Sequence, residues 1–504
     1  MNEPQYDVIV VGAGGSGLAA ACSAARLGGR VLVLEKQPQP GGTTGIAVGS
    51  FTTSGTDFQR AAGIDDNPRD HAEDAGKFAA PEIEAENNAA LRDWFLTQSA
   101  ETLAWLQSLG VSFVGPSPEP PNRVPRMHNV VPGAKAYIAA LQLDLLRHGG
   151  ELLCDAAVTS LQRDGGRVVG VTALVAGQEV TLRARRGVIL AAGDYANNPD
   201  IISRYLGEQF RSIEGINPFA GGDGHQLAEA VGAELVNMQI AYGPELRFVP
   251  SNRRPFQQWL PAGGLAARLM GAVARRLPAW VMRKMIKRLL VTWQHPEVAL
   301  FDDGAVLLNA RGERFVDEAK WPAREIGVAR QPEKVAYILL DGRLIERYSA
   351  WPHFLSTAPD IAYAYVRDYE RLRPDVTHRG RDLAEVARSA GLPVEAVARS
   401  VTEFNAYVAG EAGDPHGRTG DVQGLKDSPW VLLGPLKAYF TTTEGGAAVN
   451  QRLEVLDGAG NVIPGLYAVG QNGLGGMVLW GHGLHIAWAI TSGRLAGQSV
   501  MRDG

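Results

Sequence analysis

The sequence predicts an α/β protein in which a mainly parallel sheet is built from both ends of the chain and an α+β domain is inserted between them. Three observations predict this fold. Residues 5–36 alternate between apolar β-branched runs and an alanine-rich helix. Residues 466–500 return to that style, with an apolar run that ends in glycine and a long helical pattern. The composition between them differs, so we divide the chain into residues 1–243, 244–428 and 429–504, of which the first and last form one domain.

The opening segment has the pattern of a Rossmann-type dinucleotide-binding unit. Its first strand stops at Gly12-x-Gly14-x-x-Gly17, and its second strand ends at Glu35. Gly12 permits a tight turn, Gly14 lets the backbone approach a pyrophosphate, and Gly17 lets the helix lie close to the strand. The helix N-terminus offers N–H groups to phosphates. An acid about 20 residues further on can accept ribose hydroxyls. We therefore predict a dinucleotide site in this segment.

Composition and charge exclude several classes of protein. The chain has 504 residues and a net charge of −5, so large cores are possible and general nucleic-acid affinity is not expected. Its two cysteines, Cys22 and Cys154, are too few to ligate an iron–sulfur cluster and favour a reducing cytoplasm. We expect no metal site. Because the first strand begins within a few residues, we expect no signal peptide. No apolar run reaches the roughly 18 residues that span a membrane.

The other elements are predicted from the same periodicities and from turn residues. In chain order we expect a donor-rich loop at 38–44, helical structure over 67–109 and 133–148, a hairpin of strands at 167–175 and 178–184, a buried strand at 187–190, a helix opening at 221–224, a strand at 305–309, helices within 383–411, a strand at 466–470 and a helix at 484–500.

Several sequence blocks resemble one flavoprotein family. The chain is similar to fumarate reductases, succinate dehydrogenase flavoprotein subunits and 3-ketosteroid Δ1-dehydrogenases, and its end is closest in style to the last of these. The blocks occur in the family's order and span nearly the whole chain: the opening unit with 41–44, then 191–194, 222–224, 311–318, 444–446, 464–470 and 492–497. The resemblance implies FAD, with no visible second unit for NAD(P)H.

The resemblance also implies which residues surround the flavin. Glu35 is assigned to the adenosine ribose and Val158 to the adenine, and N–H groups at 484–486 should point at the flavin ring, where negative charge develops on reduction. Because no histidine occurs between Gly41 and Asp70, we expect FAD to be held non-covalently. The full set of predicted cofactor residues is Gly12, Gly14, Gly15, Ser16, Gly17, Glu35, Lys36, Gly42, Thr43, Thr44, Val158, Ala192, Gly193, Asp223, Gly470, Gln471, Leu484, His485 and Ile486.

The implied chemistry is transfer of two hydrogens across a carbon–carbon bond next to an electron-withdrawing group. Fumarate reductases carry an arginine shortly before the last helix, but here that place aligns near Trp480. In the steroid dehydrogenases a glycine of the same turn donates its N–H to a ketone, and Gly483 matches it. We therefore expect desaturation of a cyclic ketone, of the 3-ketosteroid or cyclohexanone type, with electrons passed to an external acceptor such as a quinone.

The sequence offers several candidates for the residue that transfers the proton. Fumarate reductases use an arginine just after the block at 311–318, and Arg324 lies close to that place but is offset by two positions. An unperturbed arginine is a poor base, and an ion pair with Glu325 or Glu318 on the surface is the alternative. The other candidates are Tyr242, Tyr363 and Tyr365 as phenols, His482 and His485 as substrate contacts, and Arg126 with His128, for which a solvated loop is the alternative.

Two further functions remain open at this point. One is reduction of an α,β-unsaturated acid, as in a fumarate reductase. The other is a flavin-binding protein without turnover, attached to a membrane.

A basic amphipathic stretch at 261–296 also has two interpretations. It forms either a solvated helix pair on the inserted domain or a helix on the inner face of a membrane, with Trp280, Met285, Ile286 and Leu289 dipping in. No Asp or Glu occurs from Leu246 to Pro296.

Overall fold

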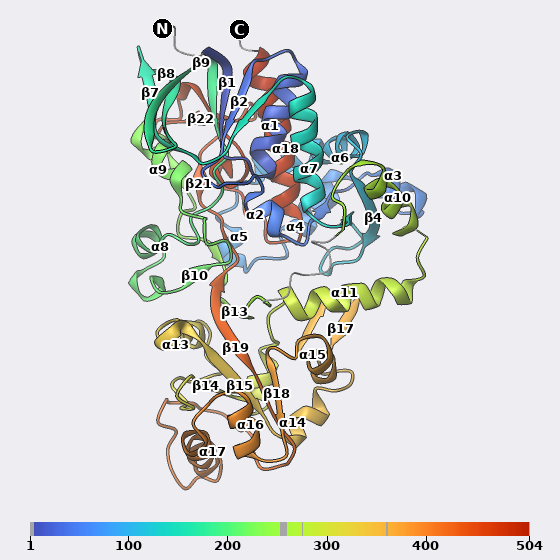
Figure 1. Ribbon diagram of the computed structural model, residues 1–504, viewed down its shortest axis with the longest axis vertical. Coiled ribbons are helices and arrows are strands. Elements are labelled where there is room, and N and C mark those ends of the chain that lie inside the picture. The colour runs from blue at the N-terminus through green and yellow to red at the C-terminus, as the bar shows by residue number, and fades with distance from the viewer. Residues whose placement is uncertain (1–4, 252–259, 275, 359–360, 503–504) are drawn as a thin grey trace.

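The protein has two lobes in a computed structural model that describes residues 5–251, 260–274, 276–358 and 361–502. The upper lobe in Figure 1 holds both ends of the chain, and the lower lobe holds the central segment. Buried hydrophobic residues form one large cluster in each lobe. The arrangement confirms an α/β domain built from both chain ends with an inserted cap.

The sheet of the upper lobe is mainly parallel, as predicted. It has eight strands, and its path runs β22-β23-β9-β1-β2-β6. Parallel pairs join β1 to β2, β1 to β9, β2 to β6 and β9 to β23, while β22 pairs antiparallel with β23. The strands on this path are β1 (Gln5–Val11), β2 (Val31–Leu34), β6 (Glu151–Leu153), β9 (Gln178–Leu190), β22 (Glu454–Leu456) and β23 (Val462–Ala468).

Three helices cover one face of this sheet. They are α1 (Gly15–Arg26), α7 (Lys135–Arg147) and α18 (Leu484–Arg502), and they lie side by side in Figure 1. The contact between α1 and α18 is made by small buried residues: Gly493 of α18 lies against Ala19 of α1, and Gly497 lies against Ala20. The last helix of the chain therefore packs directly on the first.

The structure corrects two predicted segments. The strands expected at 178–184 and 187–190 are one strand, β9, which pairs antiparallel with β8 (Arg167–Val175) and then parallel with β1. The helical stretch expected over 67–109 is three helices, because Gly76 ends the first, Pro81 begins the second and Asn88 caps the start of the third. These helices are α4 (Pro68–Ala75), α5 (Pro81–Glu84) and α6 (Ala89–Ser108). A strand that was not predicted, β7 (Ala156–Asp164), pairs with β8.

The cap is built on a six-stranded sheet around β19 (Trp430–Phe440). This long strand follows the domain boundary that we expected between 428 and 429, yet its side chains lie in the core of the cap. Its partners are β10 (Glu214–Gly215), β13 (Glu245–Phe248), β15 (Ala336–Leu340) and β18 (Thr377–Gly380), and β14 (Val306–Asn309) pairs with β15. Helices α13 (Ala323–Ala329), α16 (Leu383–Ser389) and α17 (Val394–Val408) belong to the same lobe.

Smaller elements join and complete the two lobes. They are α2 (Gly42–Ile46), β3 (Ser50–Thr52), α3 (Asp57–Ala61), β4 (Ser112–Ser117), β5 (Met127–Val131), α8 (Pro199–Tyr205), α9 (Asp223–Ala230), β11 (Leu235–Val236), β12 (Ala241–Tyr242), α12 (Ala299–Asp302), α14 (Gly342–Arg347), β16 (Ser356–Ala358), β17 (Ala362–Ala364), α15 (Val366–Leu372), β20 (Thr442–Thr443) and β21 (Gly446–Ala447).

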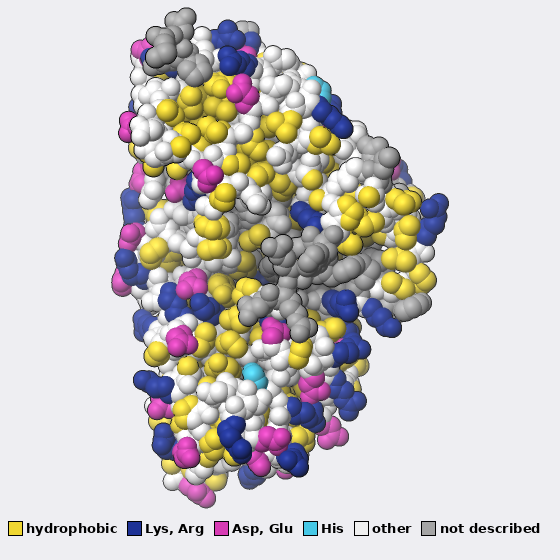
Figure 2. Space-filling view, viewed as in Figure 1, with side chains coloured by type: hydrophobic (Ala, Val, Ile, Leu, Met, Phe, Trp, Pro, Cys, Tyr) yellow, Lys and Arg dark blue, Asp and Glu magenta, His cyan; other side chains and the backbone are white. Residues whose placement is uncertain are grey.

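The basic amphipathic stretch forms two helices, α10 (Gly264–Ala274) and α11 (Ala279–Trp293). Figure 1 shows α10 against the upper lobe and α11 crossing between the lobes. Hydrophobic side chains gather over the region of α3 and α10, and Lys and Arg side chains surround that of α11 (Figure 2). Ile286 packs against the cap core, and the side chains of Trp280, Met285 and Leu289 lie outside the described residues. No described helix has both the length and the apolar composition needed to cross a membrane.

Candidate flavin and substrate site

The glycine-rich turn brings the backbone of α1 into direct contact with the backbone that follows β1. A Cβ placed on Gly17 would lie 1.9 Å from the carbonyl oxygen of Gly12, so no other residue fits there without movement. The N–H groups of Ser16 and Gly17 donate to no acceptor among the described residues. This first turn is therefore a set of free donors aimed past the end of β1, which suits a pyrophosphate.

The acidic residue at the end of β2 is fixed by the backbone. Glu35 is buried, and its two carboxylate oxygens accept from the N–H groups of Ala13, at 2.7 Å, and Gln37, at 2.9 Å. It nevertheless lines the cavity described below. Lys36 and Asp223, both predicted to touch the cofactor, form an ion pair with each other at the same edge.

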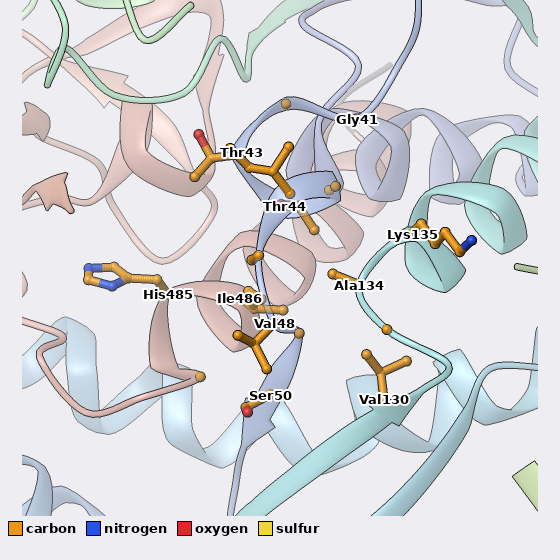
Figure 3. Close-up of a pocket in the computed structure, with 18 of the residues that line it drawn as sticks. Gly41, Thr43, Thr44, Val48, Ser50, Val130, Ala134, Lys135, His485 and Ile486 are labelled. Atoms are coloured by element: carbon orange, nitrogen blue, oxygen red, sulfur yellow. The ribbon is translucent and has the colours of Figure 1, made fainter. Parts of the chain in front are cut away.

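One cavity of about 3140 Å³ runs from the glycine-rich turn to the cap. It is lined by every predicted cofactor residue except Gly17 and Leu484, which are buried behind its wall, and by Gly483, His482, His485 and Tyr242 of the predicted catalytic residues. Figure 3 shows the segment from Gly41 to Ser50 running between His485 and Ile486 on one side and Ala134 and Lys135 on the other. The cavity thus joins a dinucleotide-sized channel to a space beneath the cap.

The start of α18 presents free backbone donors to this cavity. The N–H groups of Gly483, His485 and Ile486 donate to no described acceptor, whereas Leu484 donates to Gly481. Gly483 has a φ of +84°, and its carbonyl accepts from Ala487. Donors at a helix N-terminus stabilise negative charge, so this turn suits the electron-rich edge of a reduced flavin or a polarised carbonyl.

Beside this turn lies a buried group of ionisable side chains. His485 Nε2 is 2.9 Å from Oε1 of Glu444, whose side chain is fully buried. Burial alone would lower the pKa of His485, but the Glu444 carboxylate outweighs it and the pKa is raised. Burial raises the pKa of Asp194, whose carboxylate accepts from Thr442 Oγ1 at 3.0 Å. His485 and Glu444 thus form a buried pair near Asp194, which Thr442 holds by its hydroxyl.

The substrate-facing wall, where the upper lobe meets the cap, combines aromatic and acidic residues. Tyr242 and Trp480 pack edge to face, with ring centroids 5.3 Å apart. Beside them His482 Nδ1 lies 2.6 Å from Oε1 of Glu119. Glu119 was not predicted from the sequence: it lies in a proline-rich loop with no motif around it, and only the fold brings it to His482.

A second cluster faces the same space from the cap. Arg247 donates to Oε2 of Glu245 at 2.8 Å, and His295 Nδ1 lies 3.5 Å from Oε1 of that carboxylate. Burial lowers the pKa of His295 against the opposing effect of Glu245. Burial also opposes ionisation of Glu245, but His295 and Arg247 hold its pKa below the usual value. All three residues line the cavity.

Arg324 does not line the cavity. Its guanidinium donates to Oε1 of Glu325 at 2.7 and 2.9 Å and to the carbonyl of Glu318 at 3.0 Å, and it lies over the ring of Phe301. Both Arg324 and Glu325 are buried, so the alternative of a surface ion pair is corrected to a buried one. In this geometry the guanidinium is bound by its partners inside the cap core and does not face the cavity.

The other candidates also have structural partners. Tyr363 packs against Trp351 and Phe354, and Tyr365 lies under the ammonium of Lys287. The solvated loop considered for Arg126 and His128 is wrong, because both side chains are fully buried. Arg126 pairs with Asp66 and Asp74, and His128 Nε2 contacts Thr56 Oγ1 at 2.9 Å.

We expect Glu318→Gln to destabilise the cap strongly. Glu318 is fully buried and accepts from Arg314 at 2.9 Å and from Arg418 at 3.0 Å, and both guanidinium groups are buried too. Removing one carboxylate charge from such a network costs about 3–5 kcal/mol, because cations are left uncompensated away from water. Urea unfolding followed by tryptophan fluorescence measures the loss. The control, Glu313→Gln, removes an exposed partner of Arg311 and should leave the midpoint nearly unchanged; equal midpoints for the two variants would contradict the prediction.

The free donors at α1, the buried acid after β2 and the channel to the α18 turn together define an FAD-binding oxidoreductase fold. The comparison with known families agrees. The model of the FAD binding domain family matches residues 7–254 and 262–481. The chain belongs to this family, and its cofactor is FAD.

Several characterised proteins are similar over nearly the whole chain. The chain is 26% identical over 504 residues to a probable fumarate reductase, Ifc3, of Shewanella frigidimarina, covering 98% of this chain and 74% of that protein. It is 27% identical over 518 residues to the vinyl phenol reductase of Lactiplantibacillus plantarum, covering 98% and 96%. It is 24% identical over 596 residues to the 4-oxocyclohexanecarboxylate 2-dehydrogenase of Sinomonas cyclohexanicum, covering 98% and 92%.

A solved structure has the same arrangement of lobes. The open conformation of a flavocytochrome c3 fumarate reductase superposes with a TM-score of 0.72 at 25% identity, covering 99% of this chain and 78% of that one. Together with the family match, these similarities make the protein an FAD-dependent oxidoreductase that acts on CH–CH bonds.

Proposed function

We propose that the protein desaturates a neutral cyclic ketone, of the cyclohexanone or 3-ketosteroid type, and passes the electrons to an external acceptor such as a quinone. The observation that carries this proposal is the charge on the substrate-facing wall. Arg247 and His482, which face this space, each contact a carboxylate, Glu245 and Glu119 respectively. A substrate with two carboxylates would meet these acids, whereas a neutral ring can pack against Tyr242 and Trp480.

The turn before α18 supplies the polar contact that such a ring requires. The N–H of Gly483 is unused by the described residues and lies in the wall between the flavin channel and the substrate space. Donated to a ketone oxygen, it would stabilise the negative charge that develops when a neighbouring C–H bond loses its proton. FAD, held non-covalently, supplies the hydride acceptor for the other hydrogen.

Anaerobic mixing of the flavin-loaded protein with a panel of compounds tests the proposal. The panel contains cyclohexanone, a saturated 3-ketosteroid, succinate and a longer saturated acid. We expect the ketones to bleach the flavin absorbance and the acids to leave it unchanged. Bleaching by the acids alone would overturn the proposal.

The alternative is reduction of an α,β-unsaturated acid, and its support is the similarity to a fumarate reductase. It is tested in the opposite direction, with the flavin reduced by dithionite and reoxidised by fumarate, a longer enoate or a cyclic enone. Reoxidation by the enone and not by the acids would favour the ketone. The acidic groups Glu119 and Glu245 on the wall are the reason that we place this alternative second.

A further inference from the structure

A loop of the upper lobe and the turn before α18 meet at a histidine–carboxylate pair. Oε1 of Glu119 accepts from the backbone N–H of His482 at 2.7 Å and contacts the ring Nδ1 at 2.6 Å. Two contacts to one oxygen fix both the main chain and the ring of His482. The Glu119 side chain is only 7% exposed, so the carboxylate is shielded from water while it holds the ring.

The rest of the His482 ring faces the cavity. Its side chain is 58% exposed, and the residue lines the wall beneath the cap together with Tyr242 and Trp480. With Nδ1 on Glu119, Nε2 is at the opposite side of the ring, and no described residue forms a hydrogen bond with it. The next residue, Gly483, carries the free N–H that we assign to the ketone oxygen. A carbonyl donor and a free ring nitrogen therefore come from adjacent residues.

The other candidates for the acid–base are less suited to move a proton near neutral pH. Burial raises the pKa of the Tyr242 phenol to about 12, so its anion is scarce. His295 contacts Glu245 from the cap, and burial lowers its pKa. Arg324 is paired with Glu325 in the cap core. Of the three histidines on the cavity wall that face a carboxylate, His482 has the shortest contact, at 2.6 Å against 2.9 Å for His485 and 3.5 Å for His295. A histidine ring held in this way, with its other nitrogen free of described hydrogen bonds, is suited to transfer a proton near neutral pH.

We propose that His482 is the catalytic acid–base of this protein and that Glu119 is its positioning residue. This proposal takes only its substrate class from the proposed function. In desaturation, the C–H bond next to the ketone breaks and its proton goes to Nε2. The neighbouring C–H bond breaks and its hydrogen leaves with the electron pair to oxidised FAD, and the new C=C bond forms between the two carbons. In reduction of a C=C bond, the proton leaves Nε2 for the carbon.

The pH dependence follows from the charges around the ring. Glu119 raises the pKa of His482 most strongly, burial opposes it, and Glu245 and Arg247 act from the cap with opposite signs. Tyr242 and His295 face the same space. Neutral His482 is the base, so flavin reduction by substrate should speed up as the pH rises through its raised pKa. Protonated His482 is the acid, so reduction of a C=C bond should slow over the same range. Glu119→Gln lowers this pKa and should move both limbs to lower pH.

The test uses stopped-flow flavin reduction by whichever saturated compound bleaches wild-type protein, or reoxidation by whichever unsaturated compound accepts its electrons. We expect His482→Gln to keep FAD and to be bleached normally by dithionite. Its rate of flavin reduction by substrate should fall about a hundredfold or more, and this rate should no longer depend on pH through the pKa of His482, a dependence called here the pH limb. Glu119→Gln should keep the limb at a lower pH. In D₂O, wild-type protein should place one deuterium next to the electron-withdrawing group of the reduced product, and His482→Gln should do so far more slowly.

Matched variants distinguish the rival outcomes. His378→Gln changes a histidine on β18 of the cap that contacts Ser389, and it should behave as wild type. Loss of the pH limb in Tyr242→Phe or His295→Gln, with the limb kept in His482→Gln, would overturn the proposal. If acids and not ketones exchange electrons with the flavin, the proposed ketone substrate fails, but the same variants measured with those acids still decide the role of His482.

Discussion

Gly17→Ala is expected to yield a protein that no longer retains FAD. The added Cβ would lie 1.9 Å from the carbonyl oxygen of Gly12 and 3.2 Å from Cβ of Ala191, so α1 must move away from the sheet. The free N–H groups of its first turn then leave the position in which they bind the pyrophosphate. The measurement is the flavin absorbance of the purified protein relative to its absorbance in the ultraviolet, before and after incubation with excess FAD.

A matched glycine in the same lobe provides the control. A Cβ on Gly458, in the turn between β22 and β23, would meet no atom within 4 Å, and Gly458→Ala should bind FAD as wild type does. Full occupancy of FAD in Gly17→Ala would show that the phosphate end tolerates a shifted helix. The N–H groups of the first turn of α1 would then not be the donors that bind the pyrophosphate.

The second large effect is expected for Gly483→Ala, which should keep FAD and lose turnover. The added Cβ would lie 2.8 Å from both the carbonyl oxygen of Ser50 and Oγ1 of Thr52, at a φ of +84° that favours glycine. The turn has to shift, and with it the N–H that we assign to the ketone oxygen. A misplacement of about 1 Å costs on the order of a hundredfold in rate. We expect this loss in kcat for a ketone substrate.

A second variant distinguishes the effect of backbone strain at a positive φ from the effect of displacing the turn before α18. Gly460 has a φ of +80° and no atom within 4 Å of an added Cβ, so Gly460→Ala carries the backbone strain without the collision. It should lose some stability and keep its kcat. If Gly483→Ala turned over ketones at the wild-type rate, the N–H at this position would not be the carbonyl donor.

The part of the site that could be predicted from the sequence is local in the chain. The turn from Gly12 to Gly17 and Glu35 belong to one strand–helix–strand unit, and their spacing alone determines their relation. Glu119 could not be found in this way, because its role depends on His482, which is 363 positions away and is brought near by tertiary packing. Arg324 was near a family position in the sequence, but Glu325 and the Glu318 carbonyl hold its guanidinium inside the cap.

The fold was predicted in outline for the same reason. Apolar β-branched runs identified β1, β2 and β23, and the parallel sheet built from both chain ends is confirmed. The sequence predicts a break between 184 and 187, because charged residues interrupt the apolar pattern there. In the structure these charges lie where β9 passes from its antiparallel to its parallel partner, and the backbone continues without a turn.

The packing of α18 on α1 has a consequence for how the protein is made. The N–H donors of Gly483, His485 and Ile486 and the helix that supports them leave the ribosome only after β19 has completed the sheet of the cap. The nascent chain can fold its cap and most of its large sheet while the flavin channel still lacks one wall. Capture of the coenzyme is therefore expected only after α18 has been made and packed, so that it reports on the integrity of this helix.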